Sequence, residues 1–102
     1  MTTVRELHDK AMFLAQLAVV ARDRDKDEAR ARDLARRAYE LERQAAELVP
    51  VTKESEPTRS VLYRSAASLA YQCREFEAAL ELVAEGVTVA DPGQTSLGWI
   101  TR

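Results

Sequence analysis

The chain holds few residues that could perform catalysis. Its 102 residues include one histidine, His8, and one cysteine, Cys73, which as a pair could act as base and nucleophile. No base stands at a recognisable spacing from Ser60, Ser65 or Ser68, and Cys73 fits better as a small, partly buried thiol. One histidine and one cysteine do not complete a usual zinc site, and the glycines stand singly rather than in a phosphate-binding loop. We therefore expect no catalytic residues, no metal site and no cofactor.

A row of arginines raises the possibility of nucleic-acid binding. Arg32, Arg36 and Arg43 fall on one side of a predicted helix, with Tyr39 at the edge of the row, and such rows can contact phosphates. A nucleic-acid-associated regulator is therefore the alternative function. Acidic residues are interleaved with the row, and the net charge is −2. This pattern favours a salt-bridged, solvated surface, so we do not expect nucleic acid to be the partner.

The composition predicts an all-α protein. Alanine, leucine, glutamate and arginine dominate, with only 3 glycines and 3 prolines, and the four dominant types all favour helices. The length fits one domain. A single cysteine and a polar N-terminus unlike a signal peptide favour a cytoplasmic protein. No apolar run approaches the ~20 residues that span a bilayer, and the excess of arginine over lysine is typical of a GC-rich bacterial genome.

Caps and prolines predict four helices that pair as two antiparallel hairpins, at about residues 4–22, 26–49, 57–72 and 75–90. Thr3 and Glu6 have the spacing of a capping box. Pro57 suits the first position of the third helix because its missing N–H has no partner to lose there. Ser55 or Glu56 would cap that helix.

The break between the first two helices rests on polar residues alone. Asp25 and Glu28 give a second capping signal, but neither glycine nor proline separates the two helices. One continuous helix over residues 4–49 is the alternative.

The last proline separates a domain from a tail. Pro92 ends the fourth periodic segment, so we expect one helical domain over residues 1–93 and a tail over residues 94–102. The tail lacks helical periodicity, but its Leu97, Trp99 and Ile100 are apolar enough to dock on the domain.

The first predicted helix is more apolar than one face requires. Nine of the ten residues from Met12 to Ala21 are apolar, and a helix that is apolar all round should be covered on several sides. We expect Phe13, Leu17 and Val20 to contact a second copy of the chain or another protein. A homo-oligomer is therefore expected.

Apolar and small residues of the second hairpin stand at the spacings of a known repeat, at Tyr63, Ala67, Phe76, Ala79, Gly86 and Pro92. This segment resembles a tetratricopeptide repeat, a helix–turn–helix unit. Arg74 replaces the usual turn glycine, Ala70 replaces a usual aromatic residue, and Pro92 lies one residue late. The first hairpin matches the same pattern more weakly, at Ala15, Val19, Ala31 and Ala38.

The resemblance implies both a fold and a function. The implied fold is a right-handed array of α–α hairpins, and the implied function is a non-catalytic protein–protein interaction module. In the family, the first helix of each repeat lines a concave binding face. Carried onto this chain, that face presents Val61, Arg64, Ser68, Tyr71 and Gln72, which are predicted to hold a protein or peptide partner.

Overall fold

A computed structural model of the chain describes residues 2–88. Four α-helices make up most of this part: α1 (Val4–Asp23), α2 (Glu28–Glu47), α3 (Thr58–Gln72) and α4 (Phe76–Gly86). A short 3-10 helix, Lys53–Ser55, precedes α3, and these residues include no strand. The all-α prediction of two helical hairpins is confirmed. Pro92 and the predicted tail lie outside the described residues.

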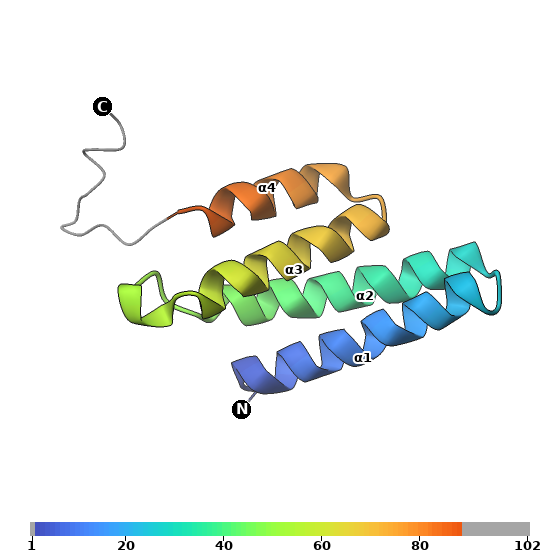
Figure 1. Cartoon of the computed structure of the whole chain (residues 1–102), viewed down its shortest axis with the longest axis horizontal. Helices are drawn as coiled ribbons and strands as arrows, with labels where there is room; N and C mark the ends of the chain where they lie inside the picture. The colour runs from blue at the N-terminus through green and yellow to red at the C-terminus, as the bar shows by residue number, and fades with distance from the viewer. Residues whose placement is uncertain (1, 89–102) are drawn as a thin grey trace.

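The helices form a row in chain order. α1 packs chiefly on α2, α2 on α3 and α3 on α4, so α1 and α4 occupy opposite edges of the row (Figure 1). No helix within residues 2–88 has the length and apolarity that crossing a membrane requires.

Side-chain caps define the first hairpin. The Thr3 hydroxyl accepts a hydrogen bond from the Glu6 amide (3.1 Å), and the Glu6 carboxylate accepts one from the Thr3 amide (2.9 Å), which confirms the capping box. Lys26 has a positive φ of 56°, and the Asp27 carboxylate accepts a hydrogen bond from the Arg30 amide to cap α2. The chain therefore breaks after Asp23, and the single long helix is wrong. The cap is Asp27 rather than the predicted Asp25.

The second hairpin begins and turns with polar residues. The Glu56 carboxylate accepts a hydrogen bond from the Ser60 amide (3.1 Å) in the first turn of α3, as predicted. Pro57 stands just before the helix rather than inside it. Arg74 turns the chain between α3 and α4 with a φ of 67°, which is a conformation that suits glycine. α4 then ends at Gly86, earlier than the sequence predicted.

Small residues bring the helices close together. Ala31, Leu34, Ala38 and Ala45 of α2 are all buried, so they lie on the core face of this helix. Gly86 lies so close to α3 that an added Cβ would stand 2.9 Å from the Tyr63 Cβ. The contact explains a glycine within a helix, where it otherwise costs about 1 kcal/mol relative to alanine.

The repeat pattern fits the first hairpin only in part. Ala31 and Ala38 are buried, as the pattern requires of small residues at a helix crossing. Val19 is 43% exposed, whereas Ala67, its proposed equivalent in α3, is buried. Its neighbour Ala18 is buried instead, so α1 does not follow the same register as α3.

Candidate interaction groove

A groove runs between α1 and α3. Its middle is lined by two α1 residues and by one side of α3, namely Met12, Ala15, Val61, Arg64, Ser65, Ser68, Leu69 and Gln72. A second hollow continues it toward the N-terminal ends of both helices, lined by Val4, Arg5, His8, Pro57, Thr58, Val61 and Leu62. Val61 lines both hollows, so they form one surface, which we call the α1–α3 groove.

Four of the five residues predicted to bind a partner line this groove: Val61, Arg64, Ser68 and Gln72. The Gln72 side-chain amide donates a hydrogen bond to the Ser68 hydroxyl (3.4 Å). Tyr71 lies elsewhere, 66% exposed, with its ring packed edge-on against Phe76 at a centroid distance of 5.3 Å. All of the predicted α3 residues except Tyr71 therefore lie along one wall of the groove.

The walls of the groove carry positive charge without negative charge. Arg5 and Arg64 are exposed, and neither forms an ion pair within residues 2–88. No aspartate or glutamate lines either hollow. Serine and threonine hydroxyls, the Gln72 amide and the apolar side chains of Met12 and Val61 complete the surface. It can therefore offer hydrogen bonds, charge and apolar contact to an extended segment.

A buried carboxylate fixes the histidine of the groove. Glu42 of α2 is completely buried, and its two carboxylate oxygens lie 2.9 and 3.0 Å from His8 Nδ1. A buried carboxylate needs such a partner because its lost hydration is otherwise uncompensated. Sequence reasoning missed this pair. The available signal was the position of Glu42 four residues after Ala38 and three before Ala45, which places it on the core face of α2.

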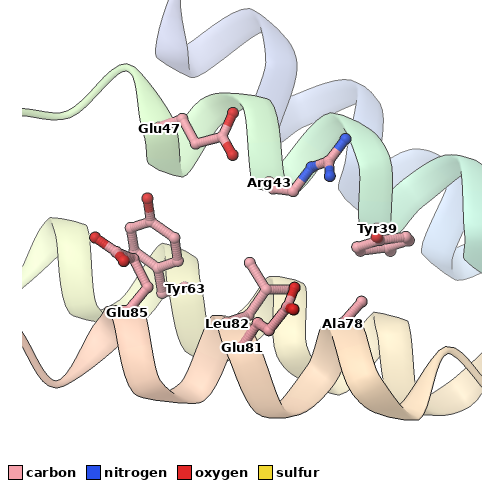
Figure 2. Close-up of a pocket in the computed structure, with 8 residues that line it drawn as sticks. All are labelled: Tyr39, Arg43, Glu47, Tyr63, Ala78, Glu81, Leu82 and Glu85. Carbon is pink, nitrogen blue, oxygen red and sulfur yellow. The ribbon is translucent and has the colours of Figure 1, made fainter.

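A separate hollow, which we call the α2–α4 hollow, lies between α2 and α4. Figure 2 shows Glu47 and Arg43 on α2, across the hollow from Tyr63 of α3 and from the labelled side chains of α4. Its walls include three carboxylates and two phenol rings, from Glu47, Glu81, Glu85, Tyr39 and Tyr63. Part of this charge is already neutralised, because Arg59 donates a hydrogen bond to Glu85 (3.0 Å). The described residues contain no group of side chains arranged to hold a metal ion.

The arginine row of α2 is engaged within the chain. Arg36 pairs with Glu75 at the start of α4, and the Arg43 guanidinium lies 5.6 Å from the centre of the Tyr39 ring. Tyr39 is buried rather than at the edge of an exposed row. Of the three arginines in this row, Arg32 alone is exposed and forms no ion pair within the described part of the chain.

Cys73 lies in the core rather than in a cleft. The thiol is 1% exposed and donates a hydrogen bond to the Ala70 carbonyl (3.3 Å). Burial raises the pKa of the Cys73 thiol above its ordinary value, which reduces the nucleophilic thiolate at neutral pH.

The residues predicted for self-association lie on the surface of α1. Phe13 is 62% exposed, Val20 is 36% exposed, and Leu17 is half-buried against the core. Comparison of the chain with family models, with curated proteins and with solved structures found no match.

Proposed function

We propose that this protein is a non-catalytic interaction module of the tetratricopeptide type, acting in the bacterial cytoplasm and binding a segment of another protein in the α1–α3 groove. The observation that supports this most is the composition of the groove. Two arginines without an intramolecular ion pair, Arg5 and Arg64, stand beside apolar side chains and the hydroxyls of serine and threonine. Such a surface suits an extended or helical segment whose carboxylates reach the arginines and whose apolar side chains reach Met12 and Val61.

Two further observations favour binding over the alternatives. The buried, protonated thiol of Cys73 is poorly placed to act as a nucleophile. Arg36 and Arg43, which would carry nucleic-acid binding, are held by Glu75 and Tyr39. Arg5 and Arg64 of the groove, in contrast, have no ion-pair partner within residues 2–88.

Peptide selection tests the proposal. A displayed library of random peptides is selected on the wild-type protein, and the recovered peptides are measured by fluorescence anisotropy. We expect acidic sequences with spaced apolar residues. Replacing Arg64 by glutamate should weaken their binding by about tenfold or more, which corresponds to about 1.4 kcal/mol.

The matched control is Arg32→Glu, because Arg32 is an exposed arginine of α2 that does not line the groove. It should leave the affinity unchanged. Equal loss in the two variants would mean that only general charge attracts the peptides. Amide shifts of the bound protein that map to α2 instead of α1 and α3 would place the binding site elsewhere.

A further inference from the structure

The outer face of α4 carries an exposed apolar stripe, whose first residue, Phe76, packs edge-on against the Tyr71 ring of α3. Phe76, Leu80, Val83 and Val87 recur at intervals of four, three and four residues, so they share one face of the helix. Their exposed fractions are 49, 71, 52 and 71%. Ala79, Leu82 and Gly86 point the other way, toward the rest of the row. We call these four exposed residues the α4 stripe.

The opposite edge of the row is also apolar. A hollow between α1 and α2 is lined by Lys10, Phe13, Leu14, Arg37, Glu40, Leu41 and Gln44. Phe13 is the most exposed apolar side chain of α1. Since α1 and α4 lie at opposite edges of the row (Figure 1), the chain exposes apolar side chains at both ends. We call this second surface the α1–α2 hollow.

The two ends carry opposite charge. Glu77 stands beside the α4 stripe, whereas Glu81 lines the hollow between α2 and α4, and residues 75–88 contain no lysine or arginine. The α1–α2 hollow presents Lys10 and Arg37 against one carboxylate, Glu40. Within residues 2–88 none of these five side chains forms an ion pair. Each end therefore lacks the charge that the other end supplies.

We propose that copies of this chain stack head to tail, with the α4 stripe of one copy on the α1–α2 hollow of the next. Arrays of helical repeats bury a continuous core by stacking, and an array that stops normally ends in a polar face. Both ends here are apolar, and their charges are complementary. A symmetric contact between two α4 stripes is disfavoured because it would bring the Glu77 carboxylates of the two copies together.

This geometry predicts an assembly that does not stop at two copies. A head-to-tail contact uses two different surfaces, so each added copy leaves one free end of each kind. The products are chains of increasing length or a closed ring. Arg64 of the α1–α3 groove also lines a hollow with Val83 and Val87, but the stripe itself lies outside the groove. The proposal therefore stands independently of the proposed function, and it is tested with variants outside the groove.

Variants with one damaged end provide the test. Sedimentation equilibrium of the wild-type protein over a range of concentrations should show masses that rise beyond a dimer, or one closed ring. Phe13→Asp damages only the hollow, and Leu80→Asp damages only the stripe, so each variant alone should be monomeric. An equimolar mixture of the two should form a heterodimer and stop there, because each variant supplies one intact surface. Val51→Asp, at an exposed valine of the α2–α3 loop, is the control and should assemble like the wild type.

Charge reversal tests the pairing itself. Arg37→Glu and Glu77→Arg should each weaken assembly by about tenfold, and the double variant should regain part of that loss. Circular dichroism of every variant verifies that the helices are intact.

Three results would overturn the proposal. The first is a wild-type protein that stays monomeric at every concentration. The second is a dimer that persists in Phe13→Asp, which would mean a symmetric contact. The third is a red shift of tryptophan fluorescence when Leu80→Asp is introduced into a monomeric protein. Trp99 is the single tryptophan of the chain, so such a shift would mean that residues 89–102 cover the stripe.

Discussion

Two charged side chains are fully buried, and each is matched by specific partners. Glu42 meets His8, and Arg59 donates hydrogen bonds to the Thr88 carbonyl (3.1 Å) and to Glu85 while lying 4.8 Å from the centre of the Tyr63 ring. Neither burial was predicted from the sequence. In each case the hydrogen-bond partners stand more than twenty residues away in the chain, and helical periodicity reports nothing about such distant contacts.

The His8–Glu42 pair makes a prediction about stability. Replacing His8 by alanine leaves a buried carboxylate without its partner and should lower the free energy of unfolding by about 1–3 kcal/mol. Replacing Glu42 by leucine should cost less, because it removes the buried carboxylate together with its need for a hydrogen-bond partner. Urea unfolding followed by circular dichroism measures both effects.

The double variant separates the pair from its surroundings. Once Glu42 is leucine, His8→Ala should change the free energy of unfolding very little, because no buried carboxylate is left without a hydrogen-bond partner. An equal loss from His8→Ala in both backgrounds would show that His8 acts through packing alone.

At the scale of the elements, the sequence predicted the helices better than their ends. Their number, pairing and the caps at Thr3 and Glu56 were correct, because capping depends on residues three or four apart. The start of α2 and the end of α4 were misplaced. The fourth helix ends at Gly86 although apolar residues continue beyond it, and its close contact with Tyr63 is a tertiary feature that periodicity does not report.

The α3–α4 turn makes a second prediction. Arg74 holds a left-handed backbone, which costs a non-glycine residue about 1 kcal/mol. Arg74→Gly should therefore raise the free energy of unfolding by about 0.5–1 kcal/mol, despite the greater freedom of glycine in the unfolded chain. Chemical denaturation gives the difference directly.

Arg24 offers the matched control for this turn. It is also an arginine after a helix, but its φ is −91°, so glycine relieves no strain there. Arg24→Gly should be neutral or destabilising. A gain in stability from both substitutions would mean that loss of the arginine side chain, rather than relief of the backbone, is responsible.

At the scale of the whole molecule, the sequence located one wall of the candidate groove. The repeat resemblance pointed to the exposed residues of α3, and four of them line it. The α1 wall, with Arg5, His8 and Met12, was not predicted, because the rotation of α1 about its axis depends on packing against α2. The α2–α4 hollow was missed for the same reason, since its residues come from three helices.

The free energy of unfolding should fall at alkaline pH. Burial raises the pKa values of the Cys73 thiol and the Tyr63 phenol above their ordinary values of 9.0 and 10.0. The unfolded chain then releases these protons at lower pH than the folded chain does. Their contribution to stability is complete below the unfolded values and is lost as pH rises toward the folded values.

Unfolding free energies measured between about pH 8 and about pH 10 should therefore decline. Cys73→Ala should make the decline shallower, because only Tyr63 remains. A wild-type profile that is flat over this range would mean that both groups titrate in the folded protein as they do in the unfolded chain.

The row of helices has a consequence for how the chain folds. Each helix packs chiefly on its neighbours in the sequence, so most native contacts close short loops. Chains of this kind fold rapidly, and folding can begin at any adjacent pair of helices. Unfolding can be equally local. Since α4 packs chiefly on α3, it can unfold while the first hairpin stays intact. Amide hydrogens at this edge should exchange with solvent before those of α2, which has a helix on either side.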